Sequence, residues 1–508
     1  MIEISAESPR KTGRRTLARA LQKAAQKPAL RRIVLFFDGP FWPAAYALLT
    51  LICSLTGGEI PFYIFTGAAL AFIALFSPDT KPALVPALLA VYSTSFMHSP
   101  RAEEDPSGYF GEPHVLAVLG AFAAVVLAAY AFRLVVFGAE RNFFRSDGNF
   151  RWSALFLTVA LLLNGAFFAD YTVFDLLLGA AVALSLFGLY IFFFSTLRTR
   201  AGLTEYLAVN LVFACGVIFA QLLWALFVEG AYSGGTIDKD LVLVGWGMSN
   251  NIGGMLAMFC PACFYLAAVR RRGCIFYVLG FLFFGGVCLT QSRSSMLVGG
   301  AILLCILVYL SVKPSPHRLF FRIFNLAALF VALLASVLFR ERIREIFAVL
   351  FERGFDDSDR FFIWKSGVKN FLRAPLFGVG FYEPIAPDWS YDIVNFVFPD
   401  MYHNLFVQML ASCGAAGAAA LAFHLFELLR LCAGKKPATE KLFSLAVIAA
   451  ILGTSLLDNH IFHIFPAMVY SVFLLSAEWS RAEEKRGADD PKEKKDLVPS
   501  PVPTEGKF

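Results

Sequence analysis

Apolar runs of about 20 residues recur along almost the whole chain, and no other feature constrains its fold so strongly. An α-helix needs a run of that length to cross the hydrocarbon core of a bilayer. Because some runs are short, we expect a bundle of about 12–14 transmembrane helices. The runs are 41–57, 61–77, 82–97, 115–138, 153–169, 174–196, 206–228, 252–269, 274–291, 296–312, 321–339, 402–429, 442–458 and 461–477.

The composition supports an all-α polytopic integral membrane protein. Hydrophobic residues make up 58% of the chain and charged residues only 16%, whereas soluble domains carry about 25% charged residues. The runs are continuous and lack the alternation of barrel strands, so a helical bundle is expected. This composition argues against a soluble enzyme, a disordered chain and a nucleic-acid-binding protein.

Basic residues gather in the N-terminal arm and in every second connection between the runs. By the positive-inside rule these segments are expected in the cytoplasm, together with both termini. An even number of spans is then required. The basic connections contain Lys81; Arg141, Arg145 and Arg151; Arg198 and Arg200; Arg270, Arg271 and Arg272; Lys313, Arg318 and Arg322; Lys435, Lys436 and Lys441.

The chain is therefore expected to have five parts. They are a basic cytoplasmic N-terminal arm (1–33), a first set of transmembrane helices (34–339), one long external loop (340–401), C-terminal transmembrane helices (402–480) and a disordered cytoplasmic tail (481–508). No cleavable signal peptide is expected, because the basic stretch is too long.

Residues 14–33 of the N-terminal arm leave two alternatives open. They form either a basic amphipathic helix on the cytoplasmic membrane surface or a disordered basic arm.

The nine cysteines lie in or at the ends of the predicted spans, so no disulfide framework is implied. Cys260 and Cys263 have the spacing of a redox or metal motif, but no second pair of ligands accompanies them. We interpret them as small packing residues and expect neither a metal site nor a cofactor.

Polar residues on the predicted outer face are the candidates for chemistry. Arg293 lies in a short external junction, and Arg360 lies in the basic external loop. A guanidinium presents a planar fork that matches phosphate oxygens. The alternative for Arg293 is a residue that merely anchors a helix end, and for the loop it is an ordinary amphipathic interfacial segment.

His403 opens the span after the external loop. A histidine there can accept a proton from a sugar hydroxyl near neutral pH, although an isolated histidine is more often a hydrogen-bonded interfacial residue. Asn404 follows it, and Gly414 and Gly417 come after a further nine residues. We expect these glycines to allow close helix contact and to lock the His403-bearing helix in place.

These residues resemble the motifs of the O-antigen ligases and the related lipid-linked polysaccharide polymerases. The spacing His403-Asn404, nine residues, Gly414, two residues, Gly417 matches the family pattern at every fixed position. The resemblance also covers Thr290-Gln291-Ser292-Arg293-Ser294, Asp359-Arg360 with Trp364, and Pro375-Leu376-Phe377-Gly378-Val379-Gly380.

The resemblance implies a GT-C-like glycosyltransferase in the bacterial cytoplasmic (inner) membrane. Such an enzyme moves a glycan from an undecaprenyl diphosphate carrier without a metal and with inversion. Arg293 and Arg360 would hold the diphosphate, and His403 would activate the acceptor hydroxyl. Tyr402, Asn404, Gly414, Gly417 and Trp364 would support the site.

The acceptor stays open. A ligase would use lipid A-core, and a polymerase would use a second carrier-linked repeat unit. A flippase for lipid-linked sugars is a more distant alternative, because the spans here are nearly uncharged. We expect Arg293, Arg360 and His403 to share one external cavity that continues into a lipid-facing groove.

Overall fold

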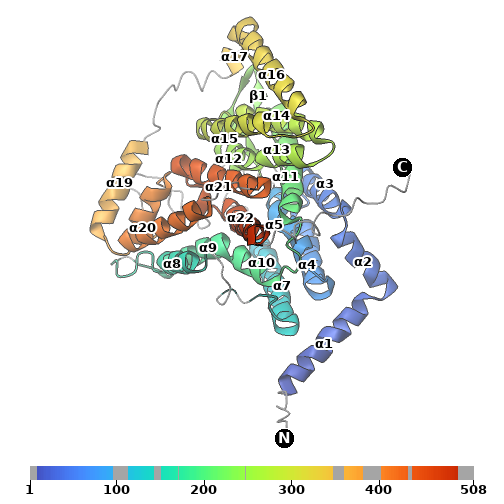
Figure 1. Cartoon of the computed structure of the whole chain (residues 1–508). Coiled ribbons are helices and arrows are strands. Elements are labelled where there is room, and N and C mark those ends of the chain that lie inside the picture. Colours follow the sequence, from blue (N-terminus) through green and yellow to red (C-terminus); the bar gives the residue numbers. More distant parts are fainter. Residues whose placement is uncertain are drawn as a thin grey trace.

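The computed structural model describes residues 9–94, 113–141, 143, 150–169, 171–245, 247–346, 360–381, 402–432 and 438–489. In this part of the chain the backbone is helical apart from connections and two hairpins of two-residue strands (Figure 1). The hairpins pair β1 (Tyr232–Ser233) with β2 (Thr236–Ile237) and β3 (Leu243–Val244) with β4 (Gly247–Met248), both antiparallel. The predicted all-α polytopic membrane fold is confirmed.

The helices follow one another as α1 (Pro9–Ala25), α2 (Pro28–Asp38), α3 (Phe41–Thr56), α4 (Glu59–Phe76), η1 (Lys81–Ala83), α5 (Leu84–Leu89), η2 (Ala90–Ser93), α7 (Pro113–Phe137), α8 (Arg151–Leu162), α9 (Val173–Ala183), η5 (Leu184–Gly188), α10 (Leu189–Thr196), α11 (Leu203–Phe227), η6 (Lys239–Leu241), α12 (Ser249–Phe259), α13 (Pro261–Val269), α14 (Gly273–Leu289), α15 (Arg293–Val312), α16 (Arg318–Leu338), α17 (Arg340–Ile346), α19 (Arg360–Arg373), α20 (Leu405–Cys432), α21 (Thr439–Asp458), η7 (His460–Phe462) and α22 (Ile464–Asp489).

Each predicted apolar run coincides with one or more of these helical elements. Among the described residues, nine helical segments are long and apolar enough to cross a membrane by length and composition. One bent pair, α2 with α3, passes the same test jointly, and four further apolar helices are shorter. These 10- to 17-residue helices explain why the sequence could give only a range for the number of spans.

Helix α11 runs through the centre of the bundle. Its residues Leu207, Leu211, Ile218 and Leu222 are fully buried, and it packs against α3, α5, α12, α13 and α14. Helix α16 is the opposite case: only 6% of its apolar window is buried, and it lies at the edge of the bundle in Figure 1. A lipid-exposed helix of this kind needs no protein partner to satisfy its apolar side chains.

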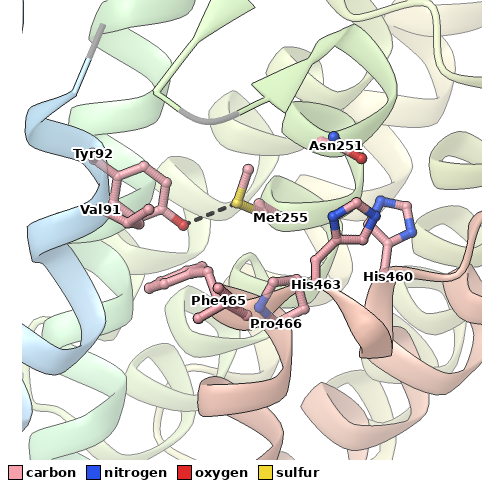
Figure 2. Close-up of a pocket in the computed structure, with 9 residues that line it drawn as sticks. Val91, Tyr92, Asn251, Met255, His460, His463, Phe465 and Pro466 are labelled. Carbon is pink, nitrogen blue, oxygen red and sulfur yellow. Dashed lines mark hydrogen bonds between the residues drawn. The ribbon is translucent and has the colours of Figure 1, made fainter. Parts of the chain in front are cut away.

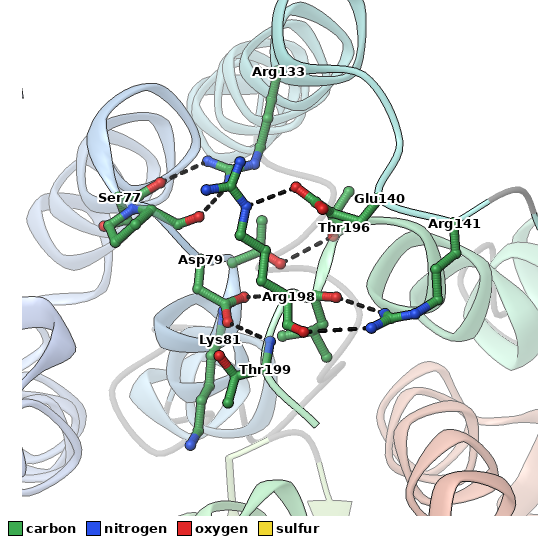
Figure 3. A network of polar contacts seen from close by, with 12 residues as sticks. Ser77, Asp79, Lys81, Arg133, Glu140, Arg141, Thr196, Arg198 and Thr199 are labelled. Atoms are coloured by element: carbon green, nitrogen blue, oxygen red, sulfur yellow. Dashed lines mark hydrogen bonds and ion pairs between the residues drawn. The ribbon is translucent and has the colours of Figure 1, made fainter. Parts of the chain in front are cut away.

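A polar network ties the ends of several helices together (Figure 3). The buried Arg133 of α7 donates to the carbonyls of Ala74 and Ser77 at 2.9 and 3.0 Å, where α4 ends. Asp79 accepts from the backbone amide of Arg198 at 3.2 Å, and the Arg198 side chain pairs with Glu140 at 2.6 Å. Helix ends carry unsatisfied carbonyls, and Arg133 satisfies those where α4 ends. We call the end of the bundle that holds Arg133, Asp79, Glu140 and Arg198 the network end.

The network end and the end of the bundle that holds His403 lie at opposite ends of α11. Lys81, beside the network, lies over the ring of Tyr206 near the start of α11. Gln221 lies 15 residues further along the helix and donates to the carbonyl of Tyr92 at 2.6 Å. With a rise of 1.5 Å per residue the two levels are about 22 Å apart. Tyr92 belongs to the end that holds His403, called here the His403 end.

The N-terminal arm is helical where it is described. Residues 9–38 form the helices α1 and α2. Of the two alternatives left open, the structure therefore contains the helical arm and not the disordered one. Gly39 and Pro40 end α2, because proline cannot continue a helix, and the chain turns by 79° into α3.

The described part of the chain extends into the predicted tail, 481–508. Helix α22 continues past residue 480 to Asp489. The segment Arg481-Ala482-Glu483-Glu484-Lys485-Arg486 consists of strong helix formers, so α22 continues through it. Residues 490–508 lie outside the described part of the chain.

The predicted external loop, 340–401, contains two helices in its described portions, α17 and α19. The remainder, 347–359 and 382–401, lies outside the described residues.

Candidate functional site

Helix α20 is broken at Gly414, and a segment of the predicted external loop that follows α19 fills the break. We call this segment, Pro375–Phe381, the strap. Gly414 has φ of 64° and ψ of −159°, which is not helical. The amides of Ala415 and Ala416 donate to the carbonyls of Pro375 and Leu376 at 2.8 and 3.1 Å.

The strap returns two hydrogen bonds to the first half of α20. The amides of Val379 and Gly380 donate to the carbonyls of Ala411 and Ser412 at 2.9 and 3.1 Å. A break in a membrane helix exposes backbone groups that lipid cannot satisfy, so such breaks occur where protein covers them. Here four backbone bonds cover it.

Gly414 therefore has a different role from the one the sequence indicated. We expected it to permit close contact between helices. Instead it adopts a left-handed φ, and a Cβ there would lie 2.5 Å from the carbonyl of Leu376. At Gly417 a Cβ would lie 2.2 Å from the Cβ of Cys413, one turn back in α20 itself, so this glycine relieves crowding beside the kink within one helix. The strap, more than helix packing, fixes the His403-bearing helix.

His403 is paired with a buried carboxylate. Its Nδ1 lies 2.9 Å from Oδ1 of Asp458, the last residue of α21. The His403 side chain is 37% exposed, and that of Asp458 is 8% exposed. The other oxygen of Asp458 is buried and has no hydrogen-bond partner among the described residues. When the carboxylate accepts from Nδ1–H, the neutral imidazole keeps its lone pair on Nε2.

The backbone at His403 is strained and is supported on both sides. Its φ is 50°, a left-handed value that is uncommon for a residue with a side chain. Asn404 caps α20, because its Oδ1 accepts from the amides of Phe406 and Val407 at 2.9 and 3.1 Å. Asn404 also donates to the carbonyl of Leu456 in α21 at 3.1 Å. Strain of about 1–3 kcal/mol persists only where the surroundings impose it, typically at functional sites.

Gln408 connects the residue before His403 with the residue after Asp458. Its Oε1 accepts from the amide of Tyr402 at 3.0 Å and from the side chain of Asn459 at 2.7 Å. Asn459 follows Asp458 and has φ of 51°. One buried amide thus fixes the residues beside both members of the His403–Asp458 pair.

Helix α19 packs on the start of α20 and carries two of the predicted residues. A Cβ on Gly367 would lie 2.9 Å from the ring of Tyr402, and Asn370 donates to the Tyr402 hydroxyl at 2.8 Å. Arg360 is the first residue of α19 and is partly buried, and its side chain makes no hydrogen bond or ion pair with the described part of the chain. Trp364 is also partly buried and stacks edge-on against Phe361 at 5.3 Å.

Arg293 lies at the same end of the bundle as Asp458. It is the first residue of α15, whose cap Ser292 accepts from the amide of Ser295. Lys313, after the end of α15, donates to Thr439 at the start of α21, so the two helices run antiparallel.

A second contact between α15 and α21 shows which part of α21 lies beside Arg293. Val298, five residues after Arg293, lies 2.8 Å from the position of a Cβ on Gly453, five residues before Asp458. Arg293 and Asp458 are therefore level along adjacent helices, whose axes usually lie 8–10 Å apart.

Two adjacent glycines of α12 bring the remaining parts of this end together. A Cβ on Gly253 would lie 2.5 Å from the Thr290 hydroxyl, and a Cβ on Gly254 would lie 2.4 Å from Nε2 of His460. The turn that carries Arg293 and the loop that follows Asp458 thus pack against neighbouring positions of one helix.

Two more histidines lie behind the pair, on a small pocket (Figure 2). His460 and His463 line it with Tyr92, Asn251 and Met255, and the Tyr92 hydroxyl donates to the Met255 sulfur at 3.2 Å. Burial lowers the pKa of His463 to about 3 and also lowers the pKa of His460, against the opposing effect of Asp458. Both rings are therefore neutral near pH 7, and His403 remains the histidine with solvent access.

An apolar groove begins one turn from His403. It has a volume of about 400 Å³ and follows α20 across its break. It is lined by Phe406, Met409, Leu410, Ala418, Leu421, Ala422, Leu425, Phe426 and Leu429. Phe406 and Leu429 are about half to two-thirds exposed, so the groove opens sideways along the bundle.

Sequence reasoning missed Asp458 and Gln408. Asp458 is the last residue of the predicted run 442–458, on the predicted outer side, and a carboxylate at that boundary was the available indication. Gln408 is an amide inside an apolar run. Buried polar groups of this kind are expensive in a membrane and are often functional.

Comparison with known proteins finds a family model that matches the central region. Residues 278–422 match the model of a family described as O-Antigen ligase. The matched region contains Arg293, Arg360 and His403 and the strap. A comparison with curated proteins found no match. The match confirms the resemblance to the O-antigen ligase superfamily, and it supports a membrane enzyme of the ligase or polymerase type that transfers glycans.

Proposed function

We propose that this protein transfers a glycan from an undecaprenyl diphosphate carrier to an acceptor hydroxyl, with His403 as the general base. The observation that carries the proposal is the hydrogen bond from His403 to the buried carboxylate of Asp458. A base that takes a proton at Nε2 needs a partner at Nδ1 to fix its tautomer and to stabilise the imidazolium that forms. Asp458 is such a partner.

In the proposed step the acceptor oxygen attacks the anomeric carbon while the bond from that carbon to the diphosphate oxygen breaks. The acceptor proton moves to Nε2 of His403. The diphosphate leaves with the bonding electrons on the face opposite the attack, so the configuration inverts. Arg293 and Arg360 hold the diphosphate and stabilise its developing charge.

The two arginines suit a transfer that needs no metal. A diphosphate is already a good leaving group, and guanidinium groups supply fixed positive charge in a bidentate geometry. Arg360 begins α19 and Arg293 begins α15. The positive ends of two helix dipoles therefore add to their charge, an arrangement that favours phosphate binding.

The apolar groove along α20 supports a lipid-linked donor. The polyprenyl tail is too apolar to leave the bilayer, and the groove would keep it in lipid while the diphosphate reaches the arginines. The groove opens one turn after His403, so a tail attached to a diphosphate at the arginines would have an apolar surface close by.

The proposed topology places the His403 end on the outer face of the bacterial cytoplasmic membrane and both termini in the cytoplasm. It rests on the basic connections, which gather at the network end in Arg141 and Arg198 (Figure 3). The proposed acceptor is lipid A-core. A second carrier-linked unit, as in a polymerase, is the alternative.

The test uses purified protein, a synthetic undecaprenyl diphosphate oligosaccharide and either acceptor. We expect transfer by the wild type and by the control His317→Ala. His317 lies at the start of α16, where its Nδ1 contacts the Cys274 sulfur. His403→Ala should bind the donor with near wild-type affinity and transfer nothing.

A folded His403→Ala variant that transfers at the wild-type rate would refute the assignment. A ladder of products made without lipid A-core would identify a polymerase in place of a ligase.

A further inference from the structure

A row of cations lies along the first two helices, far from the site just described. Arg19 and Lys23 lie one turn apart on α1, Lys27 lies at the junction of the two helices, and Arg31 and Arg32 lie on α2. All five are exposed. None of their side chains makes a hydrogen bond or ion pair with the described part of the chain.

The same stretch contains no acidic residue to neutralise these charges. From Ser8 to Phe37 the sequence has neither Asp nor Glu. Solvated surface helices usually mix charges of both signs, because i,i+4 pairs of opposite sign stabilise a helix. A single-sign row therefore fits an anionic partner better than it fits bulk water.

The orientation of α2 indicates which anionic partner that is. α2 turns by 79° from α3, so it lies close to the plane of the membrane that α3 enters. Phe37 holds it there, with ring centroids 4.7 Å from Trp42 and 5.6 Å from Phe72. Trp42 also donates to the carbonyl of Pro82 at 3.0 Å, which places α2 at the network end, beside Lys81.

The outward face of α2 mixes cations with apolar side chains. Ile33, Leu35 and Phe36 are 42%, 59% and 43% exposed, next to Arg31 and Arg32. Such a face suits the boundary between head groups and acyl chains, where apolar side chains dip into lipid and arginines meet phosphates. A soluble polyanion would leave these apolar side chains exposed to water.

We propose that α1 and α2 form a docking surface for anionic phospholipid head groups of the adjacent leaflet. The row of five cations binds the phosphates, and the apolar side chains of α2 anchor it at the interface. The surface lies at the opposite end from His403, so this proposal does not depend on the identity of the glycan or its acceptor. Each cation near an anionic membrane contributes about a fivefold preference.

The test uses the full-length protein in nanodiscs of phosphatidylcholine alone or with about one third phosphatidylglycerol. Trypsin cleavage after Arg19 and Lys23, which are both exposed and both followed by alanine, reports whether the surface is covered. We expect cleavage to be at least about tenfold slower in the anionic discs, and high salt should remove the difference by screening.

Two matched pairs of substitutions separate specific docking from general charge. Arg31→Gln/Arg32→Gln leaves both cleavage sites intact and should restore most of the cleavage rate. Arg271→Gln/Arg272→Gln removes two other adjacent exposed arginines and should leave the protection unchanged. Equal cleavage in the two kinds of disc, or equal loss of protection with both pairs, would overturn the proposal.

Discussion

Replacing Asp458 by Asn tests the proposed base most directly. The substitution keeps the size of the side chain and leaves an oxygen that accepts from Nδ1 of His403, so only the charge is lost. Asp458 is the residue that the geometry adds to the sequence motif, at 2.9 Å from His403.

The size of the effect follows from burial and distance. Two unit charges about 4 Å apart interact by about 4 kcal/mol at an effective dielectric constant of 20. His403 is 37% exposed, so solvent screening reduces this to about 2 kcal/mol at the lower limit. A loss of about 2–4 kcal/mol of transition-state stabilisation slows transfer by about 30- to 1,000-fold.

The assay measures single-turnover transfer from a labelled donor, with donor binding measured separately. We expect kcat to fall by that factor for Asp458→Asn, while the Kd of the donor and the melting temperature stay close to those of the wild type. If Asp458 were only a structural residue, the melting temperature and kcat would fall together and the Kd of the donor would rise. Transfer within about threefold of the wild type would refute the reasoning.

Three further outcomes are expected. In a thermal unfolding assay, Gly414→Ala should lower the free energy of unfolding by about 3 kcal/mol or more, because its Cβ would meet the Leu376 carbonyl. The control Gly216→Ala has open space around its Cβ and should be neutral or slightly stabilising. Arg293→Ala and Arg360→Ala should each weaken donor binding by about 1.5–3 kcal/mol, with partial rescue by Lys, as measured by titration with the labelled donor. Ala422→Trp fills the groove and should weaken binding of a long-tailed donor but not of a short-tailed analogue, whereas Ala332→Trp on the lipid-exposed α16 should change neither.

The fold was predictable from the sequence because the bilayer leaves few choices. A run such as 206–228 must be helical to satisfy its backbone in lipid, and α11 occupies that position. The least predictable places are those where polar residues end a helix early. The run 153–169 is helical only as far as Leu162, and its remainder forms a turn in which Asn164 accepts from the amide of Phe381 in the strap at 3.2 Å.

The site was predictable only where one local pattern carried it. His403, Asn404 and Gly414 stand in a single motif, whereas Arg293, expected in a short junction, is the first residue of α15. Asp458 is 55 residues away from His403, and no local pattern joins the two. Their contact depends on how α20 packs against α21. The strap was recognised as part of a glycine-containing motif, but its four backbone bonds to α20 are visible only in three dimensions.

The position of the strap in the chain also affects how α20 enters the membrane during synthesis. It precedes α20 in the chain, so it is synthesised before the broken helix enters the bilayer. The backbone groups freed at Gly414 then meet their partners as soon as the helix is inserted, and they avoid a cost of several kcal/mol for each group left in lipid. In a circular permutant that placed α20 ahead of the strap, the helix would enter the membrane incomplete, and it would be exposed to degradation until the strap arrived.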